Sequence, residues 1–144
     1  MVVARVERFE DLEAWKQARE LSAAIYRATG TATSQQDYGL RNQIRRAAVS
    51  IVSNMAEGFE RGGNREFRPF LAQARGSAGE VWAQFYVALD AGLIERAQFD
   101  ALKALAGDAS RLVAGLMRYL AETEYQGSKA KSIRDEMITL NFEP

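Results

Sequence analysis

Apolar residues recur at steps of three and four along much of the chain, which is the spacing that puts side chains on one face of an α-helix. The first such stretch runs from about Phe9 to Ala28. The second opens with Ser34 and Asp37 at a capping-box spacing and continues to Glu57, after which Gly58 is expected to stop the helix. These patterns predict two amphipathic helices joined by a loop.

Two further helices are predicted after a glycine-rich turn. Asn64 is expected to cap a helix that runs to about Asp90, and the fourth helix spans about Ala97 to Leu120. Alternating steps of three and four predict the core stripe of the fourth helix at Leu102, Leu105, Ala109, Leu112, Leu116 and Tyr119. Four helices of similar length with short connections are typical of an all-α, antiparallel up-down-up-down four-helix bundle.

The same pattern divides the chain into two parts. Residues 1–120 form the predicted four-helix bundle domain, and residues 121–144 are a polar tail with room for at most one short helix. No window approaches the roughly 20 apolar residues that cross a bilayer, and acidic residues come early in the chain. We therefore expect a soluble cytoplasmic protein with no membrane partner.

Composition narrows the chemistry. The 144 residues are 47% hydrophobic, which is enough for one domain to bury a core, and they include neither cysteine nor histidine. Those two absences exclude thiol catalysis, Ser-His-Asp triads, structural zinc sites and carboxylate–histidine di-iron sites. We expect no enzyme activity, no metal and no cofactor.

Arginine gathers in one part of a chain whose net charge is zero. Between residues 41 and 75, seven arginines stand against three glutamates, a local net charge of +4. The planar guanidinium makes paired hydrogen bonds to phosphate, so this part is a candidate nucleic-acid interface. The residues expected to contact nucleic acid are Arg41, Arg45, Arg61, Arg65, Arg68 and Arg75.

Other residues near the arginines leave alternatives open. Phe59, in the loop expected after Gly58, could stack on a base or enter a subunit interface. Gly76 and Gly79 weaken a helix, so they indicate close approach of another helix, from the same bundle or from a neighbouring subunit. Glu57 could act as a general base in a phosphoesterase, but no second carboxylate at metal-ligand spacing accompanies it.

Three segments carry a family resemblance: FEDLEAWKQARELS, YGLRNQIRRAAVSIVSNMAEGFERG and FLAQARGSAGE. Across about Phe9 to Leu120, the chain resembles the four-helix bundle proteins of the 23S rRNA-intervening-sequence family. Val52 stands where the family often has proline, and Met55 stands where isoleucine is usual. Both departures are compatible with the family's fold.

The resemblance implies further properties. Relatives assemble into a closed ring of five, and related accessory proteins of diversity-generating retroelements bind nucleic acid and a reverse transcriptase. No catalytic activity comes with the family. The resemblance also implies a structural polar cluster of Arg46, Asn54, Glu57 and Glu80, in which Arg46 would meet the two glutamates across helices.

Three functional hypotheses follow. The first is a non-enzymatic, homo-oligomeric protein, a pentamer by the resemblance, that binds RNA or DNA through its arginines. The second is a protein–protein scaffold or accessory subunit whose arginines make ion pairs between subunits. The third is a phosphoesterase that uses Glu57 and a divalent metal. We favour the first, and phosphate binding that weakens with salt would separate it from the second.

Overall fold

Four α-helices make up nearly all of the structure, a computed structural model that describes residues 6–31 and 37–125. The helices are α1 (Glu13–Ala28), α2 (Tyr38–Glu60), α3 (Asn64–Asp90) and α4 (Arg96–Tyr125), and a short 3₁₀ turn, η1 (Phe9–Asp11), precedes α1. The described residues contain no β-strand. The prediction of an all-α chain with four helices is confirmed.

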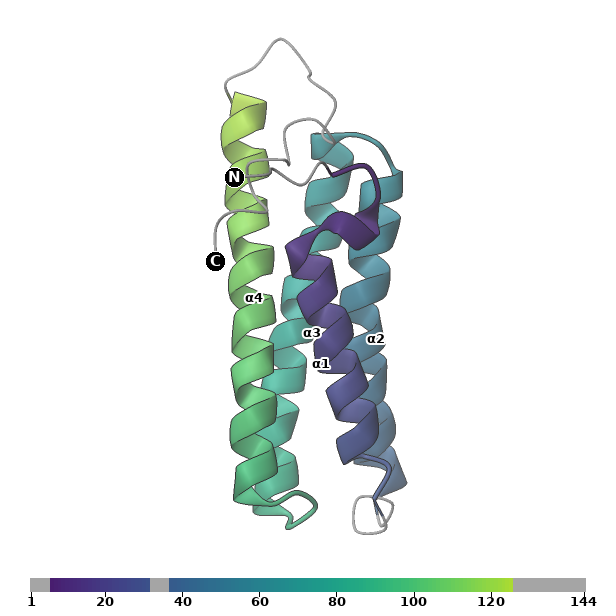
Figure 1. The fold of residues 1–144 in the computed structure, drawn as a ribbon, viewed down its shortest axis with the longest axis vertical. Helices are drawn as coiled ribbons and strands as arrows, with labels where there is room; N and C mark the ends of the chain where they lie inside the picture. The colour runs from purple at the N-terminus through teal and green to yellow at the C-terminus, as the bar shows by residue number, and fades with distance from the viewer. Residues whose placement is uncertain (1–5, 32–36, 126–144) are drawn as a thin grey trace.

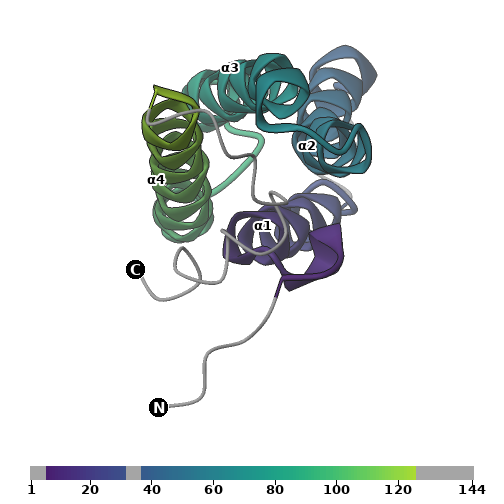
Figure 2. The ribbon, with the colours of Figure 1, turned by 90° about the horizontal axis from the view of Figure 1, so that it is seen from above.

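The helices lie side by side along the long axis of the molecule (Figure 1). In that view α1 ends and α2 begins at the lower end, α2 is joined to α3 at the upper end, and α3 is joined to α4 at the lower end. Seen from above, each helix has two neighbours: α1 and α3 each lie beside α2 and α4 (Figure 2). The four apolar faces therefore share one core.

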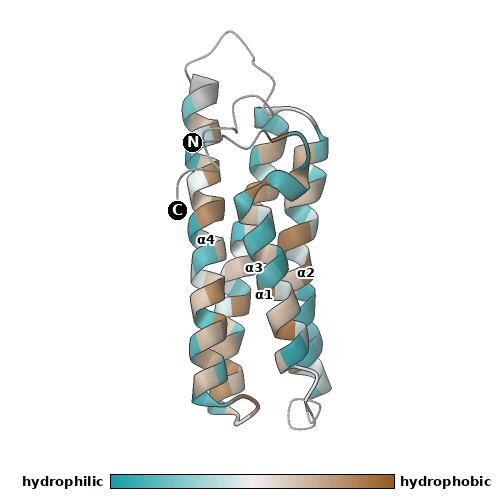
Figure 3. Ribbon diagram, in the orientation of Figure 1, coloured by the Kyte–Doolittle hydropathy of each residue, from teal (hydrophilic) through white to brown (hydrophobic). Residues whose placement is uncertain are grey.

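The core is built from one stripe of each helix. Hydrophilic and hydrophobic positions alternate along every helix (Figure 3), and the hydrophobic ones supply the buried side chains. The largest buried side chains are Leu12, Leu21, Ile25, Ile51, Met55, Phe59, Phe67, Leu71, Phe85, Phe99 and Leu120. Among the described residues, no helix combines the length and the apolar content that a membrane span requires.

The buried stripe of α4 differs from the predicted one at alternate positions. The residues buried as predicted are Leu102, Ala109 and Leu116. The others buried are Phe99, Ala106, Val113 and Leu120, whereas the predicted Leu105, Leu112 and Tyr119 are only partly buried. Neighbouring helix positions are about 100° apart. The periodicity therefore predicts the spacing of the buried residues, but it does not decide between two adjacent positions when both are apolar. The helix also extends five residues beyond the predicted end at Leu120.

The start of α2 is later than predicted. Asp37 is the N-cap residue, and its side chain accepts a hydrogen bond from the backbone N–H of Leu40 at 3.0 Å. Such a cap satisfies one of the free N–H groups of the first turn. Ser34 lies outside the described residues, as do residues 126–144 of the predicted tail.

The predicted end of α2 is wrong. The helix continues through Gly58 to Glu60, and Phe59 is completely buried and not in an exposed loop. A Cβ atom placed on Gly58 would lie 2.6 Å from Cβ of Phe70 and 2.9 Å from Cδ1 of Phe67. The glycine therefore lets α2 and α3 approach closely near their connection. At the start of α3, Gly63 and not Asn64 occupies the N-cap position.

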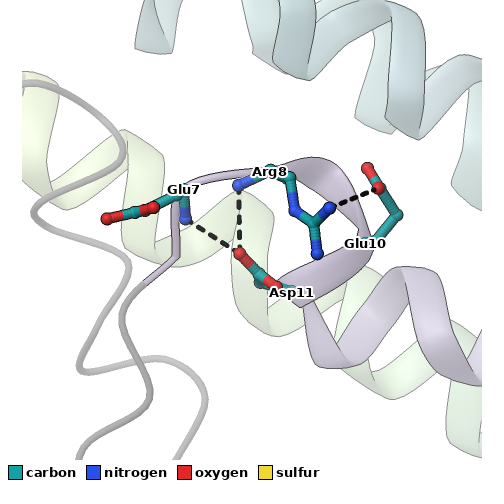
Figure 4. A network of polar contacts seen from close by, with 4 residues as sticks. All are labelled: Glu7, Arg8, Glu10 and Asp11. Atoms are coloured by element: carbon teal, nitrogen blue, oxygen red, sulfur yellow. Dashed lines mark hydrogen bonds and ion pairs between the residues drawn. The ribbon is translucent and has the colours of Figure 1, made fainter.

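The turn that leads into α1 is held by one carboxylate (Figure 4). The Asp11 side chain accepts hydrogen bonds from the backbone N–H groups of Glu7, at 3.0 Å, and Arg8, at 3.1 Å. These bonds favour the charged form, and they hold the pKa of Asp11 below its ordinary value; the bond from Glu7 is the largest cause. The side chain of Arg8 forms an ion pair with Glu10 and not with Asp11.

Asp11 makes the stability of this turn depend on pH. Because the folded state lowers the pKa of the carboxyl, its contribution is present above the ordinary value of about 3.9 and is lost as the pH falls below it. We expect the thermal midpoint of the wild type to fall more steeply below about pH 4 than that of Asp11→Asn. Circular dichroism melts across an acid series check this, and parallel profiles would contradict it.

Candidate nucleic-acid interface

The arginines that cluster in the sequence are divided between the two ends of the bundle. Arg41 and Arg45 lie in the first turns of α2, whereas Arg61 follows its last turn and Arg65 and Arg68 begin α3. With a rise of about 1.5 Å per residue, Arg41 and Arg61 are about 30 Å apart along the helix axis. The six predicted contact residues therefore do not form one surface patch.

The upper group, Arg61, Arg65 and Arg68, lies near the connection between α2 and α3 and has no excess of positive charge. Arg61 forms an ion pair with Glu57 at 3.0 Å, and its guanidinium carbon lies 5.3 Å from the centre of the Phe70 ring. The carboxylate of Glu66 folds back against Gly63 at the N-terminus of α3. From residue 57 to residue 68, three arginines stand against three glutamates. The charges cancel at this end.

The lower group lies in a part of the chain that has almost no acid. Between Glu20 and Glu57 the sequence contains four arginines and a single carboxylate, that of Asp37. That carboxylate caps α2 through the N–H of Leu40. This part carries a net charge of +3, supplied by Arg27, Arg41, Arg45 and Arg46. The unbalanced positive charge of the original cluster is therefore concentrated where α1 ends and α2 begins.

A hollow of about 360 Å³ lies between α1 and α2 at this end. We call it the α1–α2 groove, and it is lined by Tyr26, Asn42, Arg45, Arg46 and Val49. The sequence reasoning did not single out the tyrosine, the asparagine or the valine. Two features of the sequence point to them. Residues 21 to 36 include no acidic residue, and Asn42, Arg46 and Val49 follow at helical spacings of four and seven positions, which puts them on one face.

Arg45 joins the two walls of the groove. Its Nε donates to Oγ1 of Thr29 at 2.8 Å, and Nη2 donates to the backbone carbonyl of Tyr26 at 3.4 Å. The guanidinium carbon lies 4.4 Å from the centre of the Tyr26 ring. A cation is favourable at a helix C-terminus, where backbone carbonyls are left without partners. Arg45 is therefore chiefly a structural residue that fixes Tyr26 in place.

Arg41 also stacks on a tyrosine. Its guanidinium carbon lies 4.6 Å from the centre of the exposed Tyr38 ring, while its Nε is buried and has no hydrogen-bond partner in the protein. The side chain borders an apolar cavity of about 20 Å³, together with Ile44 and Phe85.

Arg46 is the exposed arginine of the groove, and the predicted polar cluster does not assemble around it within the chain. Glu57 lies eleven positions further along α2, about 16 Å away, and it pairs with Arg61. Glu80 accepts a hydrogen bond from Gln84 at 3.3 Å. The guanidinium of Arg46 thus faces the groove and not a carboxylate of α3.

Asn54, the fourth member of the predicted cluster, belongs to a separate set of contacts. Its amide nitrogen donates to the backbone carbonyl of Ser50 at 2.8 Å and to the Ser50 hydroxyl at 2.9 Å. The Ser50 hydroxyl also lies 2.8 Å from that of Ser77, which links α2 to α3. These polar side chains tie the two helices together midway along the bundle.

Neither Arg75 nor Glu57 gains a site from the fold. Arg75 is exposed on α3, about two turns beyond Arg68. Glu57 is more than half exposed, and within residues 6–31 and 37–125 no three acidic residues gather where a metal ion could bind. The described part of the chain therefore offers no cluster of acidic residues to support the phosphoesterase hypothesis.

Sequence comparison places the fold in a family. The family model of the 23S rRNA-intervening sequence protein matches residues 10–115. The chain belongs to this family. The resemblance to this family drawn from the sequence is thereby confirmed.

A solved structure supports the fold. A protein with unknown function from the S23 ribosomal protein family of Bacteroides thetaiotaomicron has a similar structure, with a TM-score of 0.66 and 18% sequence identity. The alignment covers 73% of this chain and 98% of that one. At this identity the likeness speaks for the fold alone. No curated protein matches the chain in sequence.

Proposed function

We propose that this family member is a non-enzymatic protein that binds RNA or DNA by contacting phosphate groups from the α1–α2 groove. The observation that carries the proposal is the unbalanced charge of +3 between Glu20 and Glu57, next to a hollow that Arg45 and Arg46 line. Arginine suits phosphate because its planar fork donates two hydrogen bonds at once. Arg46 makes the contact, and Arg45 holds the groove in shape.

The proposal includes an assembly. An antiparallel up-down-up-down bundle that closes into a homo-oligomeric ring of five repeats the groove around the ring, and several weak phosphate contacts then act together through their high effective concentration. Gly76 and Gly79 support a contact between copies, because a Cβ atom at either position would meet nothing within 4 Å. A cytoplasmic location and a relation to retroelement accessory proteins stay predictions.

The second candidate is a protein–protein scaffold. The same exposed glycines of α3 favour it, since they leave a flat helix surface on which another protein could pack. In that case the groove arginines form ion pairs with the partner. Nucleic-acid binding would then be absent at every salt concentration.

Arg46→Ala tests the first proposal. We expect the variant to bind a labelled RNA more weakly. The plot of log K against log salt should also become less steep, by about 0.7 to 0.9 for each groove engaged, because one phosphate contact is lost. Fluorescence anisotropy at several salt concentrations measures both quantities. An unchanged slope would contradict a phosphate contact by Arg46.

Arg65→Ala is the matched control. This arginine is also exposed, but it lies at the upper end, where the charges cancel. Its loss should leave affinity and slope close to those of the wild type. Light scattering confirms that each variant keeps the assembly of the wild type. Hydrolysis of a phosphoester that depends on magnesium and is abolished by Glu57→Gln would overturn the non-enzymatic part of the proposal.

A further inference from the structure

An exposed aromatic ring lies beside the proposed phosphate contact. Tyr26 is 45% exposed although it lies next to a packed helix pair, and the guanidinium of Arg45 is stacked over its ring. The two hydrogen bonds of Arg45 to this end of α1 hold that arrangement. Proteins that bind single-stranded nucleic acids stack the bases on exposed aromatic rings that lie beside positive charge. Tyr26 is such a ring, and Arg46 supplies the charge.

The rest of the groove complements a base. Val49 is 41% exposed and offers an apolar surface, and the Asn42 amide supplies both a donor and an acceptor. On α2 the residues Tyr38, Asn42, Arg45 and Val49 recur at steps of four, three and four, so they share one face of the helix. A volume of about 360 Å³ lies in the range of small-molecule sites.

We propose that the α1–α2 groove takes an unpaired nucleobase, stacked on Tyr26, with the adjoining phosphate on Arg46. The inference rests on the proposed function and narrows its ligand to single-stranded nucleic acid. Arg45 contributes by fixing the ring and by its own cation–π contact. Bases in loops and single strands are the ones free to enter such a hollow.

Two oligomers of equal charge test the inference. One is a labelled oligothymidylate, and the other has the same length and the same number of phosphates but abasic sugars throughout. We expect the wild type to bind the thymidylate about 5- to 150-fold more tightly at low salt, which is the range reported for stacking one base on an aromatic side chain. Tyr26→Leu should remove the difference, and Tyr26→Phe should keep it.

Tyr86→Leu is the control variant. Tyr86 is 44% exposed and also has a cation over its ring, since Lys103 Nζ lies 5.7 Å from the ring centre, but it belongs to α3 and not to the groove. This substitution should leave the preference for thymidylate unchanged. Circular dichroism melts show whether each variant is folded, and if Tyr26→Leu is not folded, Tyr26→Gln removes the ring in its place.

The outcomes separate this inference from the proposed function. Equal binding of the two oligomers by the wild type would overturn the base site and leave phosphate binding in place. A preference for thymidylate that persists in Tyr26→Leu would place the base elsewhere and overturn the assignment to this groove. Failure of both oligomers to bind at low salt would overturn the inference and the proposed function together, and a protein partner would then be the better candidate.

Discussion

Phe59→Ala is expected to lower the free energy of unfolding by about 3 to 5 kcal/mol, the range for removing a buried phenylalanine ring. The ring is completely buried. It packs edge-to-face against Phe67, with 6.0 Å between the ring centres and 87° between the planes. Its loss removes that aromatic pair and leaves a cavity between α2 and α3. Urea unfolding followed by circular dichroism measures the change.

The control for this variant is an aromatic residue at the other end of the same helix. Tyr38 is 61% exposed, so Tyr38→Ala should change stability by no more than about 0.5 to 1 kcal/mol, the scale of one exposed cation–π contact. Similar losses for the two alanine variants would contradict the burial of Phe59. Phe59→Leu, which keeps most of the apolar volume, should lose less than Phe59→Ala.

Gly58→Ala is the second substitution with a large expected effect. Alanine is the better helix former by about 1 kcal/mol, but its Cβ would overlap Cβ of Phe70 and the ring of Phe67. The Cβ of Phe70 moves only if the backbone of α3 moves with it. We expect a net loss of about 1 to 3 kcal/mol, as for other overpacked sites, measured by urea unfolding.

Gly76→Ala makes the same chemical change where there is room for it. A Cβ atom there would meet nothing within 4 Å, so the variant should gain about 0.5 to 1 kcal/mol in helix propensity when measured on the isolated chain. The two glycine variants should therefore shift the unfolding midpoint in opposite directions. A stabilised Gly58→Ala would show that α2 and α3 are not in close contact there.

The sequence was informative about helices because helix formation leaves a periodic trace. The predicted helix end at Gly58 and the predicted exposure of Phe59 are both wrong for one physical reason. Glycine ends many helices, but here the cost of glycine in α2 is offset by close packing against Phe67 and Phe70, which come from the next helix. Local propensity carries no information about such a contact. A helix that ends at Gly58 puts Phe59 in a loop, so the two errors have the same origin.

The arginine cluster shows a different limit of sequence reasoning. Residues 41 to 75 are close in the chain, but one long helix carries Arg41 and Arg61 to opposite ends of the molecule. The composition predicts that residues 41 to 75 carry a net positive charge. Where that charge lies on the surface depends on which arginines have carboxylates beside them, and this follows only from the fold. Tyr26 could not be linked to Arg45 from the sequence because their contact crosses between two helices.

The contacts that hold the two ends of α1 differ in how they respond to acid. At the upper end, the turn before α1 is held by Asp11, a group that acid neutralises. At the lower end, Arg45 bonds to a hydroxyl and to a backbone carbonyl. None of those three groups changes its protonation in acid. Acid should therefore loosen the turn that leads into α1, while the two bonds of Arg45 to the end of α1 stay in place.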